Sequence, residues 1–240
     1  MLSNESCEKD YLDRIPEGWE ELWEQEMTKE YFIEMIKWLK KEYIDPDRLH
    51  QEIYPPQDKV FRLFYLCKPQ DIKAVIIGQD PYHEKDQADG IAFSFNGKGK
   101  VPPSLKNIFK ELGYPKEYAH ATDLTNWVEK GVFLMNSILT VKEGKALSHQ
   151  NKGWETFTNA VIKYVSSKRM ALTFLLWGKY SHEKAKNIDE GRAHLLYYTS
   201  HPSPLSARKW SGGYRPFLGS KCFDVLKMNT GIDLKTFDEI

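Results

Sequence analysis

Four short apolar runs recur along the chain, and each ends abruptly at a glycine or a polar residue. β-Branched, aliphatic and aromatic residues dominate them, which is the composition of buried strands. Because buried parallel strands read as nearly continuous apolar runs, these segments predict one parallel sheet. The runs cover residues 72–77, 132–135, 172–177 and 195–199.

Amphipathic segments separate these runs. Residues 17–43 predict a helix broken near Thr28, which is expected to cap the second half. Ser104 is expected to be the N-cap of a helix that ends at Leu112. An apolar stripe in the first segment is expected to pack in the core, and it comprises Phe32, Met35, Ile36 and Leu39. Further helices are expected at residues 60–67, 153–167 and late in 215–228.

Strands that alternate with helices are typical of an α/β fold in which helices cover both faces of a sheet. We therefore predict a single-domain sandwich with a central four-stranded, mainly parallel sheet flanked by helices. The domain is expected to span residues 1–240. Residues 1–45 would form an acidic helical N-terminal part, and residues 60–232 would form the core that carries the motifs.

Polar groups follow each of the four runs. Asp80 comes just after the first run and Asn136 after the second, the Gly178-Lys179 pair follows the third, and His201 follows the fourth. Ligands of open α/β sheets bind outside the carboxyl ends of the strands. We therefore expect one cleft to contain a carboxylate, an amide, an imidazole and a glycine loop whose backbone a ligand can approach closely. Each of these residues alone has an ordinary structural explanation.

Charge is unevenly distributed along the chain. The net charge is zero, but residues 1–30 hold ten acids and three bases, which leaves 31 bases and 24 acids in residues 31–240. A mildly basic body with an acidic appendage is compatible with a polyanionic ligand. The three cysteines, Cys7, Cys67 and Cys222, are scattered, which argues for a reducing compartment and against a disulfide framework.

The sequence contains neither a signal-peptide pattern nor an apolar run long enough for a membrane helix. We expect a cytoplasmic protein, or a nuclear one if the source is eukaryotic, that does not bind a membrane. The motifs G-x-S-x-G, G-x-G-x-x-G and the P-loop are absent, which disfavours serine hydrolases and nucleotide cofactors. Asp80, His83 and His201 lack metal-ligand spacing, so neither a metal nor another cofactor is expected.

Six motifs occur in an order that identifies a family. They are GQDPYH at 78–83, GIAFSF at 90–95, PPSL at 102–105, LMNSILTV at 134–141, LLWGK at 175–179 and HPSPLS at 201–206. This set resembles the uracil-DNA glycosylases of family 1 over about three-quarters of the chain. The resemblance implies a DNA repair hydrolase that flips uracil out of DNA, cleaves its N-glycosidic bond and leaves an abasic site.

The resemblance also assigns the chemistry. Asp80 would orient or activate the attacking water and offset the positive charge that develops on the sugar. His201 would hydrogen-bond to uracil O2 and stabilise the departing uracil anion. Asn136 would read the Watson–Crick edge of the base with one donor and one acceptor. The backbone at Gln79 would add a further donor.

Shape selection and DNA contact are implied in the same way. Phe93 would stack on the uracil ring, Tyr82 would exclude the methyl group of thymine, and His83 would support the site or touch a phosphate. Leu205 would enter the base stack as an apolar wedge. The remaining expected DNA contacts are Pro102, Pro103, Ser104, Gly178, Lys179, Ser203 and Ser206.

The chain departs from the family pattern in four places. Lys179 replaces a usual serine, Asp89 replaces a usual histidine, residues 141–149 match in part, and the segment 207–216 is extended. Expected partners are single- or double-stranded DNA that contains uracil, and a proteinaceous inhibitor that mimics DNA is a candidate. The chain is expected to be a monomer. Two alternatives stay open: a DNA-binding protein without turnover and a glycosylase of relaxed base specificity.

Overall fold

A four-stranded parallel sheet forms the centre of the computed structural model, which describes residues 11–44, 52–97, 99–114 and 122–235. The strand order is β3-β2-β5-β6, and each neighbouring pair is parallel. This arrangement confirms the predicted α/β class and all four predicted strands. The strands are β2 (Ala74–Gly78), β3 (Val132–Asn136), β5 (Thr173–Trp177) and β6 (Leu195–Thr199).

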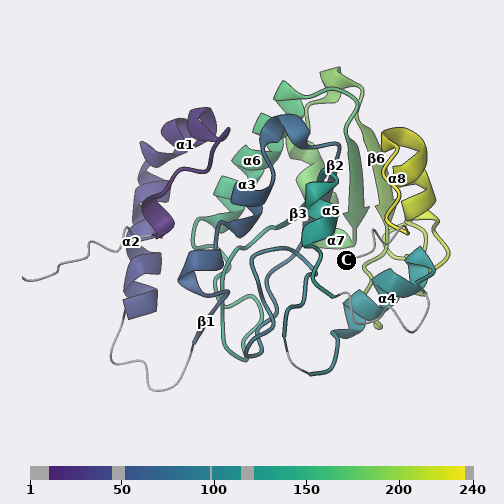
Figure 1. Cartoon of the computed structure of the whole chain (residues 1–240), viewed down its shortest axis with the longest axis horizontal. Helices are drawn as coiled ribbons and strands as arrows, with labels where there is room; N and C mark the ends of the chain where they lie inside the picture. Colours follow the sequence, from purple (N-terminus) through teal and green to yellow (C-terminus); the bar gives the residue numbers. More distant parts are fainter. Residues whose placement is uncertain (1–10, 45–51, 98, 115–121, 236–240) are drawn as a thin grey trace, which may run out of the picture.

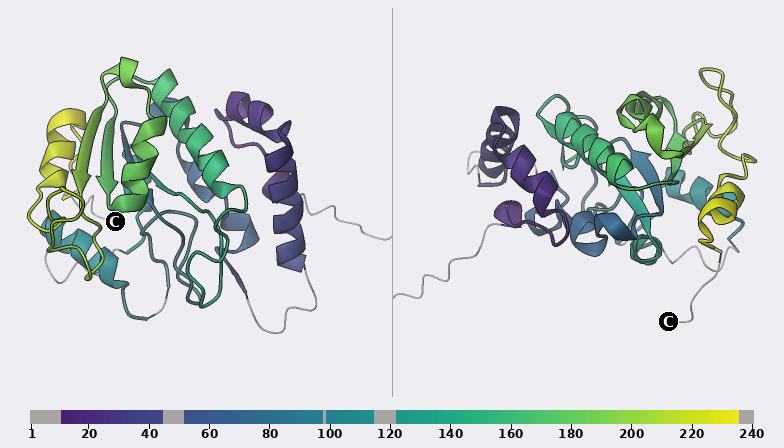
Figure 2. Two further views of the ribbon diagram at one scale, coloured as in Figure 1. Left: turned by 180° about the vertical axis from the view of Figure 1, so that it is seen from behind. Right: turned by 90° about the horizontal axis from the view of Figure 1, so that it is seen from above.

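Helices lie on both faces of this sheet (Figure 1). Helix α6 packs on one face, and α5 and α8 pack on the other. Beyond α6, α1 and α2 form an additional outer layer (Figure 2). The helices are α1 (Glu20–Met27), α2 (Glu30–Ile44), α3 (Arg62–Leu66), α4 (Pro103–Leu112), α5 (Thr125–Glu129), α6 (Trp154–Lys168), α7 (Lys179–Lys184) and α8 (Cys222–Thr230).

Smaller elements complete the chain. Strands β1 (Ile53–Tyr54) and β4 (Val141–Lys142) pair antiparallel and form a separate two-stranded sheet. The short 3₁₀ helices are η1 (Tyr11–Asp13), η2 (Gln57–Lys59), η3 (Pro69–Asp71), η5 (Ala185–Asn187) and η6 (Glu190–Arg192).

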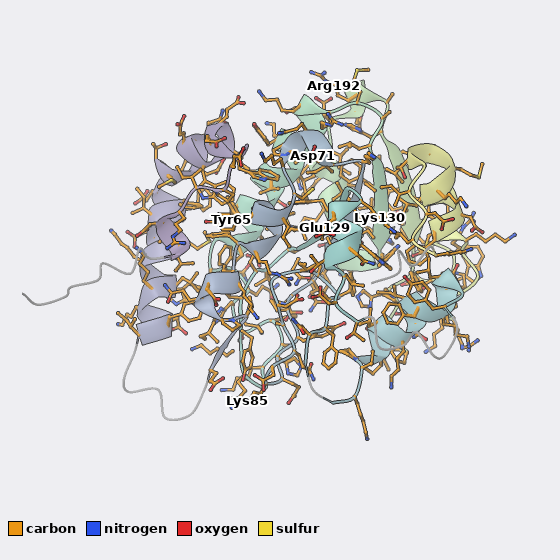
Figure 3. The ribbon with its side chains drawn as sticks, viewed as in Figure 1. Tyr65, Asp71, Lys85, Glu129, Lys130 and Arg192 are labelled. Atoms are coloured by element: carbon orange, nitrogen blue, oxygen red, sulfur yellow. The ribbon has the colours of Figure 1, made fainter. Side chains whose placement is uncertain are left out.

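All four parallel strands run toward the same end of the molecule. Figure 3 marks both ends, with Arg192 before β6 at one end and Lys85 after β2 at the other. The loops that follow the strands therefore gather at the end where Lys85 lies. The carboxyl ends of parallel strands meet at one edge of a sheet, which places the motif residues together.

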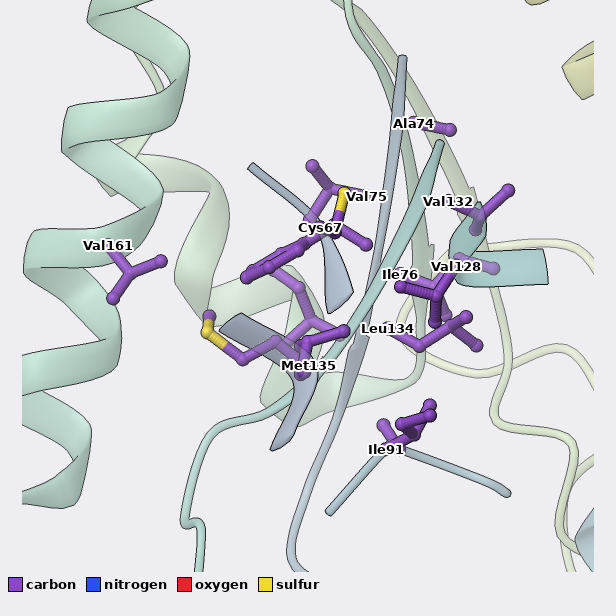
Figure 4. Close-up of a cluster of buried hydrophobic side chains, with 14 of the residues drawn as sticks. Cys67, Ala74, Val75, Ile76, Ile91, Val128, Val132, Leu134, Met135 and Val161 are labelled. Atoms are coloured by element: carbon purple, nitrogen blue, oxygen red, sulfur yellow. The ribbon is translucent and has the colours of Figure 1, made fainter. Parts of the chain in front are cut away.

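The sheet residues alternate between two buried faces. Val75 and Met135 point toward Val161 of α6, whereas Val132 and Leu134 point toward Val128 of α5 (Figure 4). These side chains are at most 2% exposed. Because both faces of β2, β3 and β5 are covered, most positions in these strands are buried and apolar, which is why their sequences read as nearly continuous apolar runs.

The N-terminal helices bury the predicted stripe. Phe32, Met35, Ile36 and Leu39 are all buried, which confirms their predicted role in the core. Trp19 and Trp23 extend this packing through edge-to-face contacts with Phe64, and such contacts stabilise aromatic clusters beyond their buried area.

Two predicted helix caps are wrong. The break near Thr28 is present, but the Thr28 hydroxyl donates to the Gln25 carbonyl at the end of α1 and does not cap α2. Helix α4 begins at Pro103 with Pro102 as its N-cap, so Ser104 lies inside the first turn. Proline suits the first helical position because its fixed φ is helical. A backbone N–H at this position would have no acceptor within the helix, so its absence in proline costs no hydrogen bond.

Candidate active site

A cleft of about 640 Å³ opens at the carboxyl ends of β2, β3, β5 and β6. Each of these strand ends contributes polar or glycine positions to its lining. Of the residues predicted for the site, those that line it are Gln79, Asp80, Tyr82, His83, Phe93, Ser104, Asn136, Gly178, Lys179, His201, Ser203 and Leu205. The expected convergence of Asp80, Asn136, Gly178-Lys179 and His201 is thus present in the structure.

The ends of β2 and β3 fix Asn136. Gly78 and Asn136 are partners in the parallel register, and the Ser137 amide donates to the Gly78 carbonyl at 2.9 Å. A β-carbon on Gly78 would lie 2.1 Å from Oδ1 of Asn136. Glycine is required here because the amide side chain occupies the space that any side chain would need.

Asp80 is a half-buried carboxylate held by two donors. The Leu147 amide donates to Oδ2 at 2.6 Å, and Nε2 of Gln79 donates to Oδ1 at 3.2 Å. Burial raises the pKa of Asp80, while the Leu147 amide, the charge of His83 and the Gln79 side chain oppose that shift. These hydrogen bonds favour the ionised form and fix the direction of its free lone pairs.

His201 is held as a neutral imidazole. The Ser203 amide donates to Nδ1 at 3.0 Å, so the neutral ring carries its proton on Nε2. Burial lowers the pKa of His201 to about 4. Gly178 packs directly against the His201 side chain. A β-carbon at position 178 would lie only 2.7 Å from Cβ of His201, so the site requires glycine there. His201 therefore offers one well-directed N–H donor at neutral pH.

An aromatic wall stands beside these polar groups. The Phe93 ring lies 5.5 Å from the Trp177 ring and 5.9 Å from the His201 ring, measured between centroids. Tyr82 donates its hydroxyl to the Phe93 carbonyl at 3.2 Å. Phe93 itself has φ +64°, an uncommon conformation for a bulky residue. The flat face of Phe93 is suited to stacking on a planar ligand.

A partly buried ion pair holds the segment that carries Phe93. Asp89 accepts from Nη1 of Arg62 at 2.8 Å, from the Ile91 amide at 3.1 Å and from the Ser94 hydroxyl at 2.7 Å. These bonds tie residues 89–94 to α3. The departure from the family pattern at Asp89 is therefore matched by a cation, and it supports the aromatic wall.

The outer loops are also tied together. Nδ2 of Asn107 in α4 donates to the Pro202 carbonyl at 2.8 Å, which joins the segment after Pro102 to the HPSPLS segment. The Ser206 hydroxyl donates to the His201 carbonyl at 2.9 Å. Leu205 projects outward with 81% of its surface exposed. An exposed leucine on a well-anchored loop is suited to insertion into a partner.

Three predicted residues, Pro102, Pro103 and Ser206, do not line the cleft, although they flank residues that do. Sequence reasoning missed Leu147, whose contribution is a backbone amide with φ +60° and leaves no side-chain signal. It also missed Arg62, which lies far from Asp89 in sequence, and Trp177, which reads simply as a strand residue. Within the ranges that the structure describes (11–44, 52–97, 99–114 and 122–235), no group of three or more His, Cys, Asp or Glu side chains could hold a metal ion.

Comparisons with known proteins identify the family of this chain. A model of the uracil DNA glycosylase superfamily matches residues 64–224. A uracil-DNA glycosylase of Borrelia duttonii (strain Ly) is 45% identical over 212 residues, which are 88% of this chain and 91% of that protein. One of Buchnera aphidicola subsp. Acyrthosiphon pisum (strain APS) is 44% identical over 211 residues, 87% of this chain and 90% of that protein.

Solved structures show the same fold. Mimivirus uracil-DNA glycosylase has a TM-score of 0.78 at 25% identity and covers 98% of this chain and 92% of its own. A tyrosine-to-phenylalanine variant of mimivirus UNG in complex with UGI has a TM-score of 0.81 at 25% identity, and the match covers 95% of this chain and 90% of that chain. The chain therefore belongs to the uracil DNA glycosylase superfamily, as its motifs predicted.

Proposed function

We propose that this chain excises uracil from DNA by hydrolysing the N-glycosidic bond of a base that has been rotated out of the helix into the cleft. Family membership supports the enzyme class. The single observation that carries the mechanism is the pairing of an anchored carboxylate, Asp80, with a neutral imidazole donor, His201, in one cleft.

Asp80 acts on the sugar side of the scissile bond. A carboxylate there orients the attacking water and offsets the positive charge of an oxocarbenium-like transition state. The Leu147 and Gln79 donors leave the remaining lone pairs of Asp80 for that water. Since Asp80 must be ionised for this role, the donors that oppose its raised pKa favour activity.

His201 acts on the departing base. Its Nε2–H donates to uracil O2, where negative charge accumulates as the glycosidic bond breaks. A neutral donor is suited to this role because it stabilises the anion without having to lose a proton at neutral pH. The Ser203 amide fixes the required tautomer, and Gly178 permits the close approach of the backbone.

Base recognition depends on four neighbouring groups. The Asn136 side chain and the Gln79 backbone pair with the polar edge of uracil, and Phe93 stacks on its face. Tyr82 stands where the methyl group of thymine would lie. The bond from Tyr82 to the Phe93 carbonyl supports a rigid wall, and a rigid wall rejects one extra methyl group better than an elastic apolar pocket does.

Residues around the rim of the cleft contact the DNA. The exposed Leu205 enters the base stack and fills the space that the flipped base leaves, since apolar side chains can insert between base steps as wedges. His83 and Lys179 line the cleft, and we expect both to contact the DNA backbone there. The other proposed contacts are Pro102, Pro103, Ser104, Gly178, Ser203 and Ser206.

We further propose a monomeric, single-domain enzyme in the cytoplasm. One buried cluster contains residues from Leu12 to Leu234, and Cys67 and Cys222 are free and buried, which suits a reducing compartment. Among the described helices, none has the length and apolar character to cross a membrane. A proteinaceous inhibitor that mimics DNA would occupy the same cleft and rim.

The decisive experiment measures release of free uracil from single-stranded DNA that contains one deoxyuridine. Uracil and an abasic site are the expected products, with no release by the double variant Asp80→Asn with His201→Leu. Binding of the same DNA without release would show instead a DNA-binding protein that has lost turnover.

A further inference from the structure

The extended segment between β6 and α8 forms a fastened hairpin. Ser211 and Tyr214 exchange backbone hydrogen bonds at 3.1 and 3.0 Å. Gly212 and Gly213, between them, have φ +57° and +83°. Positive φ at both central residues is the geometry of a two-residue hairpin turn, and glycine adopts it without strain. In the view from above, the chain between β6 and α8 extends outward from the body (Figure 2).

Side chains fix this hairpin to the sheet. The Tyr214 ring stacks on Tyr198 of β6 at 5.0 Å between centroids and lies 4.1 Å from the ring of His182. Arg215 lies over the Tyr197 ring at 5.4 Å and donates to its hydroxyl at 2.9 Å. The hairpin is therefore held in place before any partner binds, which lowers the entropic cost of binding.

The hairpin is continuous with the proposed DNA wedge. The Ala207 amide donates to the Ser203 carbonyl and the Lys209 amide to the Ser206 carbonyl, both at 2.8 Å. Trp210 follows directly and is 72% exposed. A hydrogen-bonded turn thus joins Leu205 to an exposed indole five residues further along the chain.

The surroundings of Trp210 suit a nucleic acid. Arg208 and Lys209 precede it and are exposed, and Arg215 follows the hairpin. An exposed aromatic ring interleaved with cations is the combination that binds single strands, because the rings stack on bases and the cations meet phosphates. The other six tryptophans of the chain are buried or half-buried, so the exposed position of Trp210 needs a separate explanation.

We propose that Trp210 is a stacking platform for an unpaired base beside the flipped uracil, and that it favours single-stranded over duplex uracil-containing DNA. This inference rests on the proposed function of the cleft. Bases in a duplex already stack on their neighbours, whereas bases in a single strand have free faces. In duplex DNA, Leu205 fills the space that the flipped base leaves. Trp210 adds a stacking contact with an unpaired base, which a flexible single strand can reach.

The test compares binding and uracil release for Trp210→Ala, Trp210→Phe and Met228→Ala. Met228 is a matched control because it is 84% exposed and lies on α8. Trp210→Ala should weaken the affinity for single-stranded uracil DNA about tenfold and that for duplex DNA clearly less. Trp210→Phe should keep most of the affinity, and Met228→Ala should change neither affinity.

A second readout is independent of turnover. A single-stranded oligonucleotide without uracil should quench the fluorescence of the wild type, and this quenching should be lost in Trp210→Phe. Tyr214→Ala should weaken single-strand binding in the same direction although Trp210 is intact, because the hairpin loses its anchor.

Three results would overturn the proposal. They are unchanged affinity of Trp210→Ala for both DNA forms, equal loss on both forms, or quenching that persists without Trp210. Self-association that depends on Trp210 with no effect on DNA would assign the indole to a contact between copies instead. Failure of the proposed function looks different, because the wild type would then release no uracil from either form.

Discussion

The Oδ1 atom of Asn136 lies 2.1 Å from the point that a β-carbon at position 78 would occupy, so Gly78 and Asn136 fit together only as a pair. Parallel register places the two residues side by side at the ends of β2 and β3. The last glycine of one strand thus sets the position of the amide on the next. Base recognition and strand pairing are coupled at this point of the sheet.

We therefore expect Gly78→Ala to displace the Asn136 side chain and to lower kcat/KM for uracil DNA by about ten- to a hundredfold, the range for losing a paired base-edge contact. Asn136→Ala should cost a similar factor. The double variant should cost little more than either single variant, because both remove the same contact. Additive losses would show that Gly78 acts through something other than Asn136.

Asp80→Asn should lower turnover but raise thermal stability at neutral pH. Loss of the carboxylate should lower turnover by roughly two or more orders of magnitude while DNA binding persists. Burial raises the pKa of Asp80, so its ionised form is less favourable in the folded than in the unfolded chain. The free energy of unfolding of the wild type therefore falls as the pH rises through the pKa of the folded state.

Asp80→Asn has no carboxylate to ionise, so its free energy of unfolding does not fall in this way as the pH rises. The Tm of Asp80→Asn should therefore exceed that of the wild type at neutral pH. The difference should shrink as the pH falls below the ordinary aspartate pKa of about 3.9. Thermal unfolding at several pH values measures this difference, and Asp224→Asn, at an exposed position outside the cleft lining, is a control that should leave turnover unchanged. A Tm difference independent of pH would contradict the ionisation argument.

Tyr82→Ala should release detectable thymine from DNA, whereas the wild type should release none. Removing the ring opens the place that the thymine methyl group would occupy. Tyr82→Phe is the matched control, because it keeps the ring and loses only the hydroxyl bond to the Phe93 carbonyl. We expect Tyr82→Phe to stay blind to thymine, and a thymine-blind Tyr82→Ala would show that another residue forms the wall.

Much of this architecture is visible in the sequence because both faces of the sheet are covered. Doubly buried strands read as apolar runs, and Asp80, Asn136 and His201 follow such runs closely, so their convergence is predictable from topology alone. The four-stranded α/β fold and the family are confirmed. The roles of the individual site residues stay predictions.

Other parts of the site depend on contacts that a local pattern does not contain. The donor to Asp80 is the amide of Leu147, which any residue could supply. Asp89 reads as a departure from the family until Arg62, 27 positions away, is seen to pair with it. The expected cap at Ser104 is wrong because Pro103 already starts the helix. Long-range pairing and backbone geometry determine these features.

The segment from Leu205 to Lys209 should contribute to duplex binding in two physically distinct ways. Leu205 is uncharged, so Leu205→Ala should weaken productive binding to duplex uracil DNA while the slope of log K against log salt stays nearly unchanged. Arg208→Ala with Lys209→Ala should flatten that slope, because each lost phosphate contact removes about 0.9 from it. Affinities measured at several salt concentrations separate the two effects.

Lys235→Ala is the matched control for this pair, since Lys235 lies beside Asp224 at 3.1 Å and away from the cleft lining. It should leave the slope unchanged. If the double variant also keeps the wild-type slope, Arg208 and Lys209 are solvated surface charges that do not meet phosphates. Leu205 would then be the contact of this segment with duplex DNA, since a wedge acts by burial of apolar surface and needs no counterion release.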